Sequence, residues 1–191
     1  MRMQRFTDRR EVYEDLVEVA RHLAFLDRFD DVASLAGQVV TQTLSGTLAR
    51  VAFLAEVRPL VPVTQRAWIL VADLEVQAFL AVGDLPGARR QLQAIHEQAE
   101  ARAAADPTNT GWARDLSVSH LRLGDLARAV GDLPGARTAY QASQEIFVRL
   151  AAADPTNTGW ARDLSVSHER RGDLATAAGD LPGAGTAYQT S

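Results

Sequence analysis

The sequence predicts an all-α fold: a right-handed superhelical array, or α-solenoid, of about eight helices packed as antiparallel pairs. The main observation is an internal duplication, because residues 83–130 and 131–178 align at a spacing of 48 residues with about 34 identical positions. A third copy begins at Gly179 and continues to Ser191. Self-similarity at a fixed period of this size indicates stacked supersecondary units rather than a globule with a single core.

Each copy has the pattern of two helices separated by turn signals. A turn cluster at residues 106–111 places Asn109 or Thr110 to cap the first helix. Apolar residues then recur at steps of three and four along one helical face. Gly131 is expected to end that helix in a left-handed conformation, and Asp132 is expected to cap the next one. We call the first helix of each pair the A helix and the second the B helix.

The chain is expected to have two regions. Residues 1–62 are predicted to form a divergent helical pair, with one helix over 7–26 and a second over 30–58 that bends at Ser45-Gly46. One bent helix is favoured over two because it preserves the alternation of A and B helices. Residues 63–191 are predicted to hold the repeats: A helix 63–82 with B helix 84–105, A helix 109–130 with B helix 132–153, and A helix 157–178 with a truncated B helix 181–191.

Composition limits the function classes. The net charge is −4 with no basic stripe, so nucleic acid is not an expected partner. The most apolar stretch, residues 67–76, is too short to cross a bilayer, and the N-terminus has no signal-peptide core, so a cytoplasmic protein without membrane contact is expected. The absence of cysteine excludes disulfides and thiolate metal sites. The absence of lysine excludes Schiff-base chemistry and lysine-dependent phosphate loops.

The repeat core resembles the tetratricopeptide repeat. If Gly124 is placed at the small position 8 of that motif, Gly131-Asp132 falls at its corner, Ala136 at position 20 and Tyr140 at the aromatic position 24. Small residues at these places let two helices approach closely, and the aromatic side chain fills the space between repeats. The next copy matches with Gly172, Gly179-Asp180, Ala184 and Tyr188, and the preceding copy with Gly83-Asp84, Ala88 and Leu92.

The repeat length departs from the 34 residues of the tetratricopeptide unit. A period of 48 residues is similar to the long-helix bacterial variety of such repeats, which is often attached to signalling NTPases or protease-like effector domains. The resemblance covers residues 83–191 and is weak before Thr64. The last copy ends in the first turns of its B helix, and solenoids normally need a polar capping repeat. This end is therefore expected to be open to self-association.

No enzyme is expected. The pairs Asp115–His120 and Asp163–His168 are spaced five residues apart, which does not bring the side chains face to face on a helix. No nucleophile, metal-ligand spacing or cofactor motif is organised around them, so no catalytic, metal or cofactor site is predicted. The histidines are interpreted as packed helix–helix residues.

The expected function is a protein–protein interaction module that binds a peptide or a helix of a partner on its concave face, where tetratricopeptide superhelices usually bind. The alternative is a structural or sensor segment of a larger bacterial signalling protein, with little binding of its own. Two of four motif positions change between the copies, which fits either a tuned groove or drift on a solvated face. The predicted partner-binding residues are Arg114, Val118, Leu121, Asp125, Arg128, Arg162, Val166, Glu169, Asp173 and Thr176.

Overall fold

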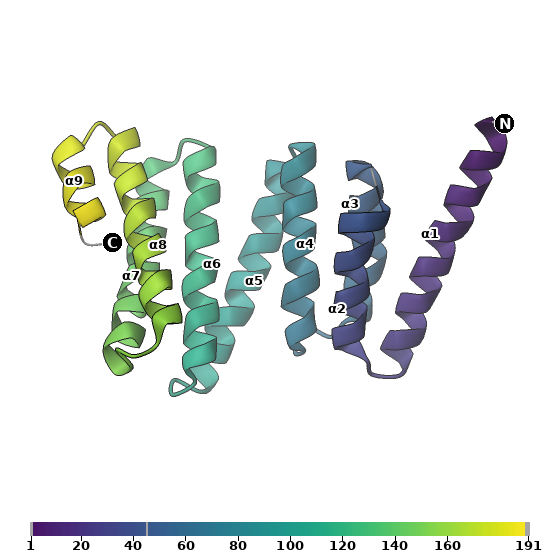
Figure 1. Cartoon of the computed structure of the whole chain (residues 1–191), viewed down its shortest axis with the longest axis horizontal. Coiled ribbons are helices and arrows are strands. Elements are labelled where there is room, and N and C mark those ends of the chain that lie inside the picture. Colours follow the sequence, from purple (N-terminus) through teal and green to yellow (C-terminus); the bar gives the residue numbers. More distant parts are fainter. Residues whose placement is uncertain (1, 45, 190–191) are drawn as a thin grey trace. The chain divides into compact units, whose positions relative to one another are not determined.

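The computed structural model describes residues 2–44 and 46–189, and side chains are described within residues 12–44, 46–187 and 189. The described residues form helices and no strand (Figure 1), so the predicted all-α fold is confirmed. The chain divides into two compact units, residues 1–91 and 92–191, which are described separately. The helices are α1 (Arg2–Phe25), α2 (Phe29–Gln38), α3 (Thr47–Val57), α4 (Arg66–Val82), α5 (Leu85–Ala105), α6 (Thr110–Ala129), α7 (Leu133–Ala153), α8 (Thr158–Ala177) and α9 (Leu181–Gln189).

The single bent helix predicted for residues 30–58 is wrong. Two helices, α2 and α3, occupy this segment, and the described residues therefore hold nine α-helices instead of about eight. After α2 the chain makes a π-helical turn over Val39–Thr43. Leu44 is then extended, with φ −90° and ψ 108°, and Gly46 is extended as well, with φ −101° and ψ 130°. The predicted bend at Ser45 lies outside the described residues.

Side-chain hydrogen bonds to the backbone explain why the helix stops. The hydroxyl Oγ1 of Thr41 donates to the carbonyl oxygen of Gly37 at 2.7 Å, a contact that competes with regular helical bonding. Nε of Arg50 donates to the carbonyl oxygen of Leu44 at 2.8 Å and so satisfies a backbone group that the break exposes. The sequence pair Ser45-Gly46 indicates a bend but does not reveal these hydrogen bonds.

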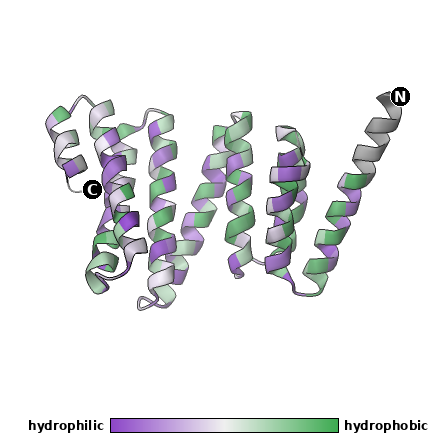
Figure 2. Ribbon diagram, in the orientation of Figure 1, coloured by the Kyte–Doolittle hydropathy of each residue, from purple (hydrophilic) through white to green (hydrophobic). Residues whose placement is uncertain are grey.

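The core of the first unit lies where α2 and α3 both pack against α4. Val32, Phe53, Leu54 and Val71 are fully buried there. Green apolar positions in Figure 2 recur on these helices, as expected for elements that bury one face. The predicted A helix over 63–82 begins three residues late, at Arg66, because Gln65 is the extended residue that precedes it.

The helices of the second unit pack in successive pairs, α6 with α7, α7 with α8 and α8 with α9. From α5 onwards each helix begins and ends within one residue of its expected range, where the structure describes the end. The side chain of Asn109 accepts a hydrogen bond from the backbone N–H of Trp112 at 3.1 Å. Asp132 accepts one from the N–H of Gly135 at 2.9 Å. Both are N-cap contacts of the expected kind.

Two glycines set the geometry of the α6–α7 pair. Gly131 has a φ of 82°, which residues with a Cβ rarely adopt, and it ends α6 as expected. Gly124 lies against the ring of Tyr140, and a Cβ added at Gly124 would come within 2.4 Å of that ring. Tyr140 is fully buried in a cluster with Ala136 of α7 and Leu174 of α8. The close approach is the packing that the small and aromatic motif positions predict.

A second cluster of the same unit is centred on Ile146, Phe147 and Leu150 of α7. Trp160 and Leu164 of α8 pack against it together with apolar residues of α6. The A helix of one copy therefore covers the B helix of the preceding copy. The boundary predicted between residues 62 and 63 and the right-handed superhelical course stay predictions.

Candidate partner-binding face

The predicted partner-binding residues lie on α6 and α8, and we call the surface that they form the A-helix face. Its first feature is an ion pair between equivalent regions of the two helices. Arg114 of α6 donates from Nε to Oδ2 of Asp163 of α8 at 2.6 Å and from Nη2 to Oδ1 at 3.2 Å. This hydrogen bonding with Asp163 raises the pKa of Arg114 above its ordinary value. A two-point contact of this kind fixes orientation as well as distance.

A second group of charges joins the same helices farther along. The hydroxyl of Tyr140 donates to Oδ1 of Asp125 at 2.7 Å, and Nε of Arg170 lies 3.2 Å from the same oxygen. Burial raises the pKa of Tyr140, and the hydrogen bond with Asp125 raises it further, so the phenol stays protonated as a donor. Asp173 lies 3.8 Å from Arg128 and 4.0 Å from Arg170. Three carboxylates of this face, counting Asp163, are thus matched by arginines.

The other six predicted partner-binding residues are either half-buried or exposed. Val118 and Leu121 are half-buried and pack against the cluster around Phe147, and Val166 is half-buried. Three of the predicted residues on α8 are exposed: Arg162, Glu169 and Thr176. The structure therefore places four of the ten predicted residues in ion pairs between α6 and α8, namely Arg114, Asp125, Arg128 and Asp173.

Sequence reasoning missed two partners in these pairs, Asp163 and Arg170. The signal was present in the repeat itself. Arg114 and Asp163 are 49 residues apart, one more than the repeat period, so they lie at nearly the same height on neighbouring A helices. Oppositely charged residues that are separated in sequence by about one repeat period therefore indicate a contact between adjacent repeats.

Histidines of the unit contact neighbouring helices. The rings of His96 and His120 lie edge to face with centroids 4.5 Å apart, and Nδ1 of His96 is 2.9 Å from the hydroxyl of Ser119. Burial lowers the pKa of His120, and the neighbouring His96 lowers it further, while Glu100 raises it. Burial likewise lowers the pKa of His168, as does the charge of Arg171.

His168 and Arg171 both contact Gln144 of α7. Nδ1 of His168 lies 3.1 Å from Nε2 of Gln144, and Arg171 donates to its Oε1. Asp163 lies five residues before His168 in the sequence, but its carboxylate forms an ion pair with Arg114. Among the residues whose side chains the structure describes, no group of three or more histidine, aspartate or glutamate side chains could hold a metal ion.

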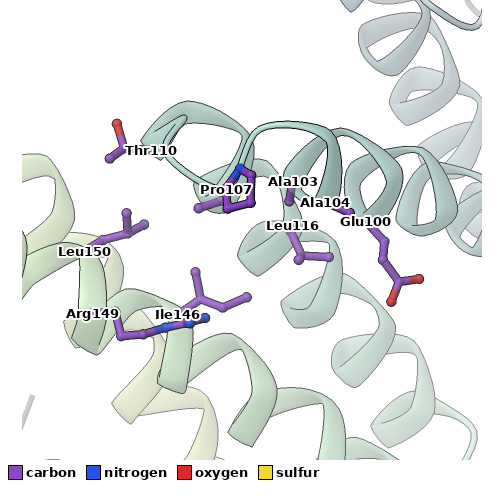
Figure 3. A pocket seen from close by; sticks show the side chains of 10 residues that line it. Glu100, Ala103, Ala104, Pro107, Thr110, Leu116, Ile146, Arg149 and Leu150 are labelled. Atoms are coloured by element: carbon purple, nitrogen blue, oxygen red, sulfur yellow. The ribbon is translucent and has the colours of Figure 1, made fainter.

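A pocket of about 420 Å³ lies between the last turns of α5, the start of α6 and the end of α7 (Figure 3). Its wall is mainly apolar, from Leu116, Ile146 and Leu150, and Glu100 and Arg149 contribute opposite charges. The lining residues are Glu100, Ala103, Ala104, Pro107, Thr110, Ala113, Leu116, Ile146, Arg149 and Leu150.

In the first unit an ion pair lies at the core. Nε of Arg58 is 3.0 Å from Oε2 of Glu75, whose residue is only 5% exposed. Burial raises the pKa of Glu75, and the arginine partly offsets this effect. Buried pairs of this kind hold charged groups in place and contribute little net stability.

Comparisons with known proteins find a structural neighbour and show no family. No family model matches the chain, and no curated protein matches its sequence. Among solved structures it is similar to the crystal structure of BtubC (BKLC) from P. vanneervenii, with 15% sequence identity and a TM-score of 0.48. The match covers 94% of this chain and 86% of that chain. Within the part of the chain that the structure describes, no helix has the length and apolar character needed to cross a membrane.

Proposed function

We propose that the chain is a cytoplasmic protein–protein interaction module built from long-helix tetratricopeptide-like repeats. It binds a peptide or a helix of a partner on the A-helix face. Support for the repeat type comes from the contact of Gly124 with Tyr140 and from the left-handed Gly131 at the corner. These are the places where the motif requires a small residue, an aromatic residue and a turn.

The observation that carries the binding proposal is the exposure of Glu169 on α8. The same position of α6 is Leu121, which is half-buried in the packing around Phe147. Two copies that otherwise match closely thus present a charged residue in one case and a packing residue in the other. An exposed, copy-specific charge gives a surface the means to discriminate between partners.

The test is a capture experiment with two matched variants. Glu169→Arg reverses the charge on the A-helix face, and Glu145→Arg makes the same change at an exposed position of the B helix α7. A discrete protein retained by the wild-type chain and by Glu145→Arg, and lost by Glu169→Arg, is expected. Equal retention by both variants contradicts the proposed face. Circular dichroism of all three proteins checks that they are equally folded.

The alternative is a structural or sensor segment of a larger bacterial signalling protein. It is favoured by the internal pairing of charges, since Arg114, Asp125 and Arg128 are engaged by residues of α8. Paired side chains stiffen the array and leave fewer groups for a ligand. A folded wild-type chain that captures no protein supports this alternative over the interaction module.

A further inference from the structure

The pocket between α5, α6 and α7 lies wholly within the second unit, since its lining residues fall within residues 100–150. The side chains that α5 and α6 contribute include three alanines, Ala103, Ala104 and Ala113, which are too small to fill the space between the helices. Ile146 and Leu150 of α7 add an apolar wall. The volume of about 420 Å³ is in the range of pockets that hold small molecules.

The two charged residues of the lining are specific to this copy. Val148 stands one period after Glu100, and Ala101 stands one period before Arg149. By contrast, the alanines of the lining recur unchanged one period later. The repeat pattern therefore accounts for the small residues that leave the pocket open, and it does not account for the pair of opposite charges.

Glu100 and Arg149 reach the pocket from different helices, α5 and α7. In the view of Figure 3, Leu116 and Ile146 lie between them. Both charged residues are exposed, and in the described part of the chain neither forms an ion pair. The pocket thus combines an apolar interior with an acid on one side and a base on the other, both open to a ligand.

We propose that this pocket binds a small zwitterion, a ligand with an apolar body between a cationic and an anionic group. The body covers apolar surface of Leu116 and Ile146, which favours binding because that surface leaves water. The cationic group lies at Glu100 and the anionic group at Arg149, and such charged contacts fix the orientation of a ligand in a mainly apolar pocket. A ligand that is anionic at both ends would place like charges together at Glu100.

This site goes beyond partner binding on the A-helix face, and the two proposals can fail independently. Glu169 does not line the pocket. Glu169→Arg is therefore expected to bind the zwitterion as the wild-type chain does, whatever its effect on the capture of a partner protein.

The chain has three isoleucines, Ile69, Ile95 and Ile146, so methyl NMR of the isoleucine-labelled full chain gives one signal inside the pocket and two controls. Ile146→Val assigns the pocket signal. The probes are the linear zwitterions 6-aminohexanoate and 8-aminooctanoate at neutral pH. A saturable shift of the Ile146 methyl with at least one probe is expected, while the Ile69 and Ile95 methyls stay in place.

A pair of alanine variants tests whether the probe occupies the pocket. Ala103→Leu fills the space and is expected to abolish the shift of the Ile146 methyl. Ala151→Leu makes the same change one period later, at a half-buried position outside the lining, and is expected to leave the shift unchanged. The Ile69 and Ile95 signals show whether each variant keeps the wild-type fold.

The charges are tested by comparing 8-aminooctanoate with octanoate, which lacks the cationic group. Glu100→Gln is expected to weaken binding of 8-aminooctanoate roughly threefold at low salt, the scale of an exposed ion pair, and not to weaken binding of octanoate. Arg149→Gln is expected to weaken both. Glu97→Gln, at an exposed position of α5 outside the lining, serves as the control and is expected to match the wild type.

Three results overturn the proposal. The first is an Ile146 methyl that neither zwitterion shifts. The second is a shift that survives Ala103→Leu or that moves the Ile69 and Ile95 signals equally, because the probe then binds elsewhere. The third is an equal effect of Glu100→Gln on 8-aminooctanoate and octanoate, which would show that Glu100 does not recognise the cationic group.

Discussion

The two copies in the second unit have closely matching sequences and different surroundings. In the α6–α7 copy, Leu133 is partly buried and Arg114 is paired with Asp163. In the α8–α9 copy the equivalent residues, Leu181 and Arg162, are exposed. The difference shows that burial in this chain is set by the neighbouring repeat, as in other arrays where each unit contacts only the next one.

The largest expected effect comes from the glycine that brings the α6–α7 pair together. Gly124→Ala places a Cβ within 2.4 Å of the Tyr140 ring, and the overpacking is expected to cost about 1–3 kcal/mol of the free energy of unfolding. Gly185→Ala is the control, because a Cβ there meets no atom within 4 Å, and it is expected to be neutral or to stabilise α9 by up to about 1 kcal/mol. Urea unfolding measures both. A loss at Gly185 as large as that at Gly124 would argue against close packing as the cause.

A leucine pair sharpens the comparison between the copies. Leu133→Ala removes side-chain contacts with the Tyr140 cluster and is expected to destabilise by about 2 kcal/mol. Leu181→Ala makes the same change at an exposed position and is expected to cost less than about 0.5 kcal/mol. The measurement is again the midpoint and slope of urea unfolding. Equal costs at the two positions would mean that the α8–α9 copy is covered in solution.

The arginine pair gives a smaller effect of the same kind. Arg114 is about half exposed, so its loss in Arg114→Ala is expected to cost at most about 1 kcal/mol. Arg162→Ala is expected to leave the free energy of unfolding unchanged within about 0.5 kcal/mol. A double-mutant cycle with Asp163→Ala isolates the pair, and a coupling energy of zero would show that the contact does not contribute to stability.

The histidine pair gives the smallest expected difference and depends on pH. The pKa values of His120 and His168 are lowered in the folded chain from the ordinary 6.5, chiefly by burial. The unfolded chain therefore binds more protons, so stability is complete above about pH 6.5 and falls as the pH drops below that value. The ring of His96 lies beside His120 and lowers its pKa further. His120→Gln is therefore expected to reduce the loss of stability at acidic pH more than His168→Gln does. Thermal midpoints at pH 5 and pH 7.5 provide the measurement, and a steeper fall in His120→Gln would contradict the assignment.

The repeat part of the fold was predictable because its signals are local and occur more than once. Caps such as Asn109 and the corner glycine Gly131 fix helix ends through the nearest residues in sequence. The break between α2 and α3 was not predictable in the same way. A contact of Thr41 with a backbone carbonyl competes there with helical bonding, and Arg50 binds the carbonyl oxygen of Leu44 after the break.

The candidate site was predictable as a set of helix faces and not as a set of contacts. Arg114, Asp125 and Arg128 were placed on the correct helix, but their engagement by α8 depends on how two distant segments align. Val118 and Leu121 were predicted as groove residues; both are half-buried and pack against the cluster around Phe147, and their part in binding stays a prediction. A motif position gives the side of a helix, whereas the neighbouring repeat decides how much of that side stays open.

Hydrogen exchange of the intact chain tests the central claim, that the neighbouring repeat determines the environment of each copy. Peptides from residues 110–153 and 158–189 are compared in one sample by mass spectrometry at neutral pH. The account predicts slower exchange in α6 and α7 than in α8 and α9, because local opening is easier where fewer apolar contacts must be broken. Equal protection of the two copies, or greater protection of α8 and α9, would contradict it.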